Sequence, residues 1–453
     1  MKQRGLIAVA ALVVGIGGVL AGRAVLGNTV QLADPAVIEA LAAQGDSLAL
    51  AQAAWVRCRA GADKASCYQQ FFVRLAEQGQ VSVALGALAA LARKDRSVES
   101  DGHVYTHLVG ITAFRPGSDV GPIFAQCTPL FQSGCYHGVI QTYLTAESGV
   151  DSAKVADLCD KVDGGVRHGF LRFQCVHGLG HGLEMIWNWE LPKTLAGCDW
   201  LTDGWDRESC YGGAFMENAV AAQPSHAPAD LLAERGDGAG GGGNDGHEAH
   251  GGGHGHGGLD LTKVTFKLRD TTELHYPCTI VGDRYLVSCY QLQGGVILRM
   301  LNWDFKAAAA ECDEAPEPWR HHCYLSIGTS AAGYTMLDAR RSIRHCDVGD
   351  PGYRPWCIVG AVKNFVDVTS DPEDGLDFCK LVPSGPNRRQ CYVAVGEELR
   401  VLFPGDAPTR TGWCARAPEG DVADCNFGAM VIAVAPPGLP LIPGQVGAAT
   451  PRR

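Results

Sequence analysis

The chain has 453 residues, 46% of them apolar, which is enough apolar material for a continuous core. Its net charge of −11 and isoelectric point of about 5.7, without a long basic run, argue against nucleic acid and anionic lipid as partners. The 18 cysteines lack the short CxxC spacing of zinc and iron–sulfur sites and fall into nine close pairs. Such pairs are typical of a disulfide framework in an oxidising compartment.

The N-terminal segment, residues 1–27, resembles an export signal in its composition. Lys2 and Arg4 precede an uncharged run over residues 5–22, whose length lies between that of a signal-peptide core and that of a full membrane span. Residues 19–21 (Val-Leu-Ala) offer a cleavage site. Two interpretations stay open, an uncleaved signal anchor and a removed signal peptide. Both predict an extracytoplasmic protein, membrane-anchored or secreted, that meets the membrane through this segment only.

From Cys67 to Cys425 a cysteine recurs about every 34 residues, and each recurrence follows another cysteine placed to be its partner. We expect nine local disulfides: Cys58–Cys67, Cys127–Cys135, Cys159–Cys175, Cys198–Cys210, Cys278–Cys289, Cys312–Cys323, Cys346–Cys357, Cys379–Cys391 and Cys414–Cys425. The interval from Cys67 to Cys135 is two periods, so we assign Asp101 to the place of a missing cysteine. A period of this length is typical of a repeat of two antiparallel helices.

Proline predicts where the helices of each unit meet. Prolines crowd the space between paired cysteines, as Pro351 and Pro355 do, so this space is the loop between a short and a long helix. The first cysteine then ends the short helix, and the second begins the long one. Such repeats fill residues 28–223 and 261–430. They predict an all-α fold, an α-solenoid of about ten helical-hairpin repeats clipped by local disulfides.

In period and disulfide placement, residues 35 to 430 resemble cysteine-rich, disulfide-stapled relatives of the tetratricopeptide-like helical repeat proteins. The tryptophan–leucine–glycine–tyrosine signature of tetratricopeptide repeats is missing, so the resemblance implies an architecture and carries no functional residue. It also implies a concave face of the kind that binds a peptide or protein.

Histidines recur at one position of consecutive repeats. His137 and His177 each stand two residues after a second cysteine, and His103 stands two residues after Asp101. One helical turn further on come His107 and His181, with Gln141 between them in the series. Side chains at equivalent positions of stacked repeats can converge, because neighbouring helices lie roughly 10 Å apart. His168 lies in an enlarged loop of the same region, where it can reach the same place.

Imidazole ligands without a free thiolate predict Zn(II) or Cu(II) at this histidine cluster. A three-histidine site with an open position also lowers the pKa of bound water, and Glu184 or Glu217 would then be the candidate general base. The chain has neither HExxH nor a G-x-S-x-G elbow, so no known hydrolase motif supports a reaction. Two other interpretations remain, a metal-free acid–base site and a set of hydrogen-bonded packing residues.

Two segments of biased composition interrupt or follow the repeats. Residues 224–260 form a predicted flexible insertion, because thirteen of the 23 residues from Gly236 to Gly258 are glycine. The four histidines of residues 236–258 offer weak metal ligands or are compositional drift: His247, His250, His254 and His256. Residues 431–453 are rich in proline, glycine and alanine and predict a disordered tail.

The sequence therefore predicts an exported helical-repeat protein that binds a transition metal for storage, delivery or an unidentified metal-dependent reaction. The alternative is an extracytoplasmic scaffold that binds a protein or peptide on its concave face. A third hypothesis is a metal-free hydrolase that uses histidine–glutamate pairs. Whether the protein is an enzyme stays open at this point.

Overall fold

The computed structural model describes residues 34–61, 63–95, 97–115, 117–146, 150–162, 169–221 and 264–440, and the chain divides into two compact units between Tyr105 and Thr106. The described residues are helical with connecting turns and contain no strand. None of the described helices has the length and apolarity that a membrane crossing requires. The predicted export signal at residues 1–27 and the predicted insertion at residues 224–260 lie outside the described residues.

The first unit, which ends at Tyr105, is built from helical hairpins. Its helices are α2 (Pro35–Gln44), α3 (Ser47–Cys58), α4 (Lys64–Glu77), α5 (Val81–Ala92) and the first half of α6 (Ser97–Ala113). α3 packs against α5, and α4 packs against both. Buried aromatic and aliphatic side chains such as Tyr68, Phe72 and Leu88 form its core.

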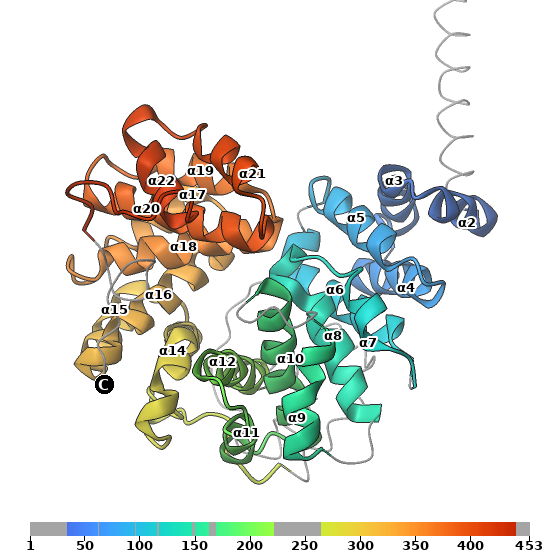
Figure 1. The fold of residues 1–453 in the computed structure, drawn as a ribbon, viewed down its shortest axis with the longest axis horizontal. Helices are drawn as coiled ribbons and strands as arrows, with labels where there is room; N and C mark the ends of the chain where they lie inside the picture. Colours follow the sequence, from blue (N-terminus) through green and yellow to red (C-terminus); the bar gives the residue numbers. More distant parts are fainter. Residues whose placement is uncertain are drawn as a thin grey trace, which may run out of the picture. The chain divides into compact units, whose positions relative to one another are not determined.

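The second unit alternates long and short helices (Figure 1). The long helices are α8 (Leu130–Ala146), α10 (Phe170–Ile186), α12 (Gly204–Ala221), α14 (Leu286–Met300), α16 (Glu317–Tyr334), α18 (Arg354–Thr369) and α20 (Pro386–Leu402). The shorter ones are α7 (Val120–Phe124), α9 (Ser152–Leu158), α11 (Leu191–Cys198), α15 (Phe305–Glu314), α17 (Ala339–His345), α19 (Pro372–Leu381), α21 (Ala407–Cys414) and the last helix, α22 (Val422–Gly428). Each long helix packs against the next, and α9, α11 and α15 lie at the periphery. The predicted all-α solenoid of helical hairpins is confirmed.

Aspartates fix the starts of the short helices. Asp304, Asp338 and Asp371 each precede a short helix, and each side-chain carboxylate accepts a hydrogen bond from a backbone N–H of the first turn. An N-cap of this kind satisfies donors that the helix itself leaves unpaired. The preceding long helices end in left-handed residues such as Asn302 and Trp303, which reverse the chain. These caps and turns give the connections before α15, α17 and α19 a common form, whereas α11 begins at Glu190 without a side-chain cap.

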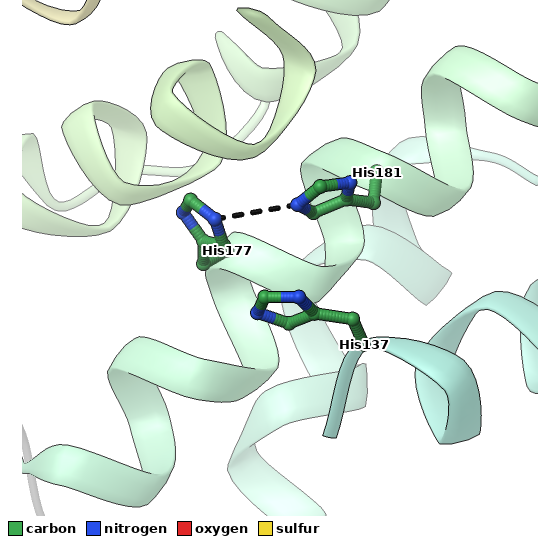
Figure 2. A group of neighbouring side chains, drawn as sticks. All are labelled: His137, His177 and His181. Atoms are coloured by element: carbon green, nitrogen blue, oxygen red, sulfur yellow. Dashed lines mark hydrogen bonds between the residues drawn. The ribbon is translucent and has the colours of Figure 1, made fainter. Parts of the chain in front are cut away.

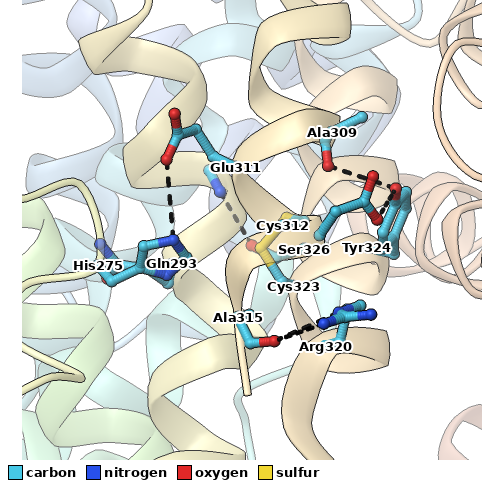
Figure 3. The surroundings of a disulfide bond; sticks show 12 residues. His275, Gln293, Ala309, Glu311, Cys312, Ala315, Arg320, Cys323, Tyr324 and Ser326 are labelled. Atoms are coloured by element: carbon cyan, nitrogen blue, oxygen red, sulfur yellow. Dashed lines mark hydrogen bonds and ion pairs between the residues drawn. A yellow bond between two sulfur atoms is a disulfide. The ribbon is translucent and has the colours of Figure 1, made fainter. Parts of the chain in front are cut away.

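All nine predicted disulfides are present. Most join the end of a shorter helix to the first turns of the next long one, but Cys278 lies in a turn before α14 and Cys425 lies in the short last helix, α22. Figure 3 shows the bond between Cys312 of α15 and Cys323 of α16, both of which are fully buried. Beside it, the Tyr324 hydroxyl donates to Asp313 over 2.8 Å, and the Arg320 guanidinium donates to the Ala315 carbonyl oxygen over 3.2 Å. Polar contacts therefore support the same joint that the disulfide closes.

Glycines let neighbouring long helices touch backbone to backbone, and these contacts define the register of the repeats. A Cβ atom on Gly213 would lie 1.9 Å from the His177 carbonyl oxygen, and one on Gly360 would lie 2.0 Å from the Leu325 carbonyl oxygen. His177 and Leu325 both stand two residues after a second cysteine. Only glycine permits such an approach.

The same contact corrects the predicted register of α6. A Cβ atom on Gly138 would lie 2.1 Å from the His107 carbonyl oxygen, so His107 occupies the position that His177 holds in its own repeat. Tyr105 then stands in the place of the missing cysteine. The prediction that placed Asp101 there, with His103 in the histidine column, is wrong by one helical turn. Without a cysteine, only the equal division of the interval guided that prediction.

The long helices of the second unit close on themselves, because α18 packs against α8 as well as against α16 and α20. The Gln132 side-chain amide of α8 donates to Asn364 Oδ1 of α18 over 2.6 Å. Gln132 lies between Phe131 and Ser133 in a run of three left-handed residues inside α8. This run directs Gln132 to α18 a few residues before His137.

The long helices have one face toward the short helices and one face away from them. The residue after the second cysteine contacts the end of the preceding short helix, as the Tyr136 hydroxyl does when it donates to the Cys127 carbonyl oxygen over 2.9 Å. Positions two, six and ten residues after that cysteine lie one turn apart on the other side of the helix. We call this side the inner face. Gln141, His181, Gly295 and Lys363 all occupy its sixth position.

Candidate metal centre

Three histidines meet on the inner face of two neighbouring long helices. His137 comes from α8, and His177 and His181 come from α10 (Figure 2). One ring nitrogen from each lies within 4.8 Å of the other two, and the described residues contain no other such group of three histidine, cysteine or acidic ligands. His137 and His181 are buried, whereas His177 is half-buried. The predicted column therefore supplies three converging imidazoles.

The rings are packed closely. His177 and His181 stand one helical turn apart on α10, and their Nε2 atoms lie 3.3 Å apart. The His137 ring stacks on the His181 ring with a centroid separation of 4.6 Å and an interplanar angle of 25°. Two helices thus supply the three rings, and the glycine contacts between neighbouring helices set the spacing of these helices.

The acceptors around the site determine which ring nitrogens carry protons. His177 Nδ1 lies 3.2 Å from the Ser209 carbonyl oxygen, and His181 Nδ1 lies 3.0 Å from Glu217 Oε2. A carbonyl oxygen can only accept a hydrogen bond, and an ionised carboxylate can only accept one too. Each Nδ1 is therefore the donor. In the neutral rings, both Nε2 atoms carry lone pairs that face one another.

Two opposed lone pairs repel each other unless a proton or a metal cation lies between them. A ligand distance of 2.0–2.1 Å and tetrahedral angles would place two imidazole nitrogens about 3.3 Å apart, which fits the separation of His177 Nε2 and His181 Nε2. Metal-bound histidines also usually donate their second ring N–H to a carboxylate or a backbone carbonyl. Both features are present. For the same ion to reach the third ring, the widest nitrogen separation, up to 4.8 Å, must close by about an ångström or more.

The two carboxyl groups that we predicted as candidate bases have different environments. Glu217 of α12 is buried and accepts the hydrogen bond from His181, so it orients the His181 ring. Glu184 of α10 is fully buried, and burial raises its pKa well above the usual value. The polar Thr194 hydroxyl nearby partly offsets this rise, and the negative charges of Glu217 and Glu190 raise the pKa of Glu184 further. These effects favour the neutral acid of Glu184 over the carboxylate that a general base needs.

The other predicted ligands do not join the three histidines. His107 is buried on α6, and Gln141 is buried on α8, one turn after His137. His103 is half-buried in the first compact unit. His168 and the insertion histidines lie outside the described residues: His247, His250, His254 and His256.

Two contacts of the site were not predicted from the sequence. The Ser209 contact uses a backbone carbonyl, which any residue type would supply. The Phe173 ring stacks on the His177 ring with centroids 5.4 Å apart, and Phe173 keeps 36% of its surface exposed. Phe173 stands one turn before His177 on α10, so the four-residue spacing could have indicated this aromatic cover.

Comparisons with known proteins identify no relative: the chain matches no protein family, no curated protein and no solved structure. The predicted resemblance to disulfide-stapled tetratricopeptide-like proteins therefore stays an expectation about architecture.

Proposed function

We propose that this protein binds one transition metal ion, Zn(II) or Cu(II), through His137, His177 and His181. The observation that carries the proposal is the orientation of the two α10 rings. Their Nδ1 atoms are held by Ser209 and Glu217, and their Nε2 lone pairs face each other at 3.3 Å. Imidazole is a preferred ligand of both ions.

The setting favours binding of the ion for storage or delivery over hydrolysis. Glu217 is engaged with His181, and burial favours the neutral form of Glu184, so neither is a free base beside the metal. The half-buried His177, under the partly exposed Phe173, gives an ion a way to the site from the surface. Nine local disulfides are compatible with an extracytoplasmic protein. We propose that the chain is exported and holds its metal there.

Elemental analysis tests this proposal. The full chain is produced through an oxidising compartment with the five histidines of residues 224–260 replaced by asparagine, so that they contribute no metal. We expect close to one zinc or copper ion per chain, and the loss of that ion in His137→Ala and His177→Ala variants that keep their helical circular dichroism. His275→Ala is the matched control, because His275 lies beside Glu311 in a different part of the second unit. A folded protein that takes up neither metal on titration would refute the proposal.

A further inference from the structure

We propose a second ligand site in this protein, which binds a small oxyanion through Arg299 of α14 and the hydroxyls of Ser326 and Ser330 of α16. It does not depend on the metal centre, and its ligand class is a phosphate or carboxylate group. Three observations support this site: the geometry around Gly295, the lack of a counter-charge for Arg299 among the described residues, and the place of both residues in the repeat.

Three polar groups surround one point above Gly295. A Cβ atom at this residue would lie 2.6 Å from Ser330 Oγ and 3.8 Å from both Arg299 Nη1 and Ser326 Oγ. Ser326 Oγ accepts a hydrogen bond from the Gly295 N–H over 3.0 Å, so its own proton remains to be donated. The guanidinium and two hydroxyls thus supply donors on one side of the α14–α16 contact.

Arg299 differs from the other partly buried arginines of the chain. Arg172 forms ion pairs with Asp206 at 2.7 Å and with Asp160 at 2.6 Å, and Arg389 pairs with Asp424 at 2.8 Å. Within the described part of the chain, the Arg299 guanidinium makes no ion pair and no hydrogen bond. A partly buried cation without a partner is costly, and an anion supplied by a ligand would offset that cost.

The local electrostatics agree with this geometry. Arg299 is half-buried, and loss of hydration lowers the pKa of its guanidinium, with no nearby carboxylate to raise it. Pairing with carboxylates instead raises the pKa of Arg172 and of Arg389. The site around Arg299 is therefore electropositive, and no described residue neutralises it.

The repeat places this site on the inner face. Gly295 stands six residues after Cys289, as His181 does after Cys175, and Arg299 stands one turn further on. At the sixth position a side chain of ordinary size would cover the guanidinium, and glycine leaves it open. A planar guanidinium can offer two parallel N–H donors to a carboxylate or phosphate, and the hydroxyls add further donors.

Binding measurements on the full chain test the inference. The probes are inorganic phosphate and succinate, each titrated calorimetrically at constant ionic strength with chloride as the reference anion. We expect saturable binding of at least one of the two probes. The probe that binds more tightly shows whether the site prefers phosphate or carboxylate. Arg299→Met keeps the length of the side chain without its charge and should weaken binding at least tenfold, since hydrogen bonds to charged groups are the strong ones. Ser330→Ala, a small change that leaves the helix contacts intact, should weaken it several-fold.

The matched control is Arg340→Met, because Arg340 is an exposed arginine of α17. It should bind the probe as the unmodified chain does. Two results would overturn the inference: neither probe binds the unmodified chain more tightly than chloride does, or Arg299→Met and Ser330→Ala both bind the probe with unchanged affinity. Metal content is measured in the same samples, so a failed oxyanion site and a failed metal centre are told apart.

Discussion

Replacing Glu217 by glutamine exchanges a carboxylate next to the candidate metal centre for a carboxamide of the same shape. The carboxylate accepts the His181 Nδ1 hydrogen over 3.0 Å, and only 4% of the His181 side chain and 10% of the Glu217 side chain are exposed. Water therefore screens this interaction little. An amide oxygen can still accept the hydrogen, so the tautomer of His181 is kept and the negative charge is lost.

The size of the effect follows from this exchange. A hydrogen bond to a charged group contributes about 1.5–3 kcal/mol, and one between neutral groups contributes about 0.5–1.5 kcal/mol. The difference of about 1.4 kcal/mol corresponds to a tenfold weaker metal affinity, at the lower end of the roughly 10–100-fold cost of removing such a partner. Glu217→Gln should therefore bind Zn(II) about tenfold more weakly.

Competition against a chromophoric chelator at constant pH measures this change. Glu208→Gln is the matched control, because Glu208 also lies on α12 but accepts its hydrogen bond from Ser288 over 3.1 Å. We expect the control to keep the zinc affinity of the unmodified chain. If Glu217→Gln keeps it as well, or if both variants lose it equally, the carboxylate does not orient His181 and our reasoning about the site is wrong.

Three further predictions concern stability. Gly213→Ala should lower the free energy of unfolding by about 1–3 kcal/mol in urea titrations, because its Cβ would lie 1.9 Å from a backbone oxygen of α10. In the control Gly412→Ala, the added Cβ would meet no atom within 4 Å, so this variant should be as stable as the unmodified chain or more stable. Burial raises the folded-state pKa of Glu184, so the stability that this group contributes is present below about pH 4.3 and is lost as the pH rises through the folded pKa. The stability of Glu184→Gln relative to the unmodified chain should therefore increase between pH 5 and pH 8. A stability difference that does not change with pH would contradict this prediction. Replacing Cys312 and Cys323 together by serine should lower the free energy of unfolding by about 3 kcal/mol, by the chain-entropy relation. Urea titrations that give the double variant and the unmodified chain the same free energy of unfolding would contradict this prediction.

The architecture could be predicted from the sequence because its main constraints are local. A disulfide such as Cys312–Cys323 spans 11 residues, so its pairing depends on one loop and not on the whole fold. The periodicity then predicts the alternation of short and long helices. Where the cysteine is lost, as in α6, the period alone divides the interval equally and misplaces the register by one turn. The close approach of Gly138 to His107 sets the true register, and this contact is not local in the sequence.

The candidate metal centre could be predicted in part. His137, His177 and His181 share a repeat register, so stacking brings them together, and the sequence shows that register. Their hydrogen-bond partners depend on how α12 is rotated against α10, which places Glu217 and the Ser209 carbonyl beside the rings. No residue pattern encodes that rotation. Arg299 likewise belongs to no recognisable motif, because what distinguishes it is that no described residue pairs with its guanidinium.

The contact between α8 and α18 limits how this protein can change its length. An open solenoid can gain or lose a repeat at little cost, because each unit touches only its neighbours. Here the Gln132–Asn364 hydrogen bond joins helices that stand several units apart in the chain. Deletion or duplication of one intervening unit would move these partners out of reach. The number of units between them is therefore fixed by closure, and variation between related chains should accumulate in loops and termini instead.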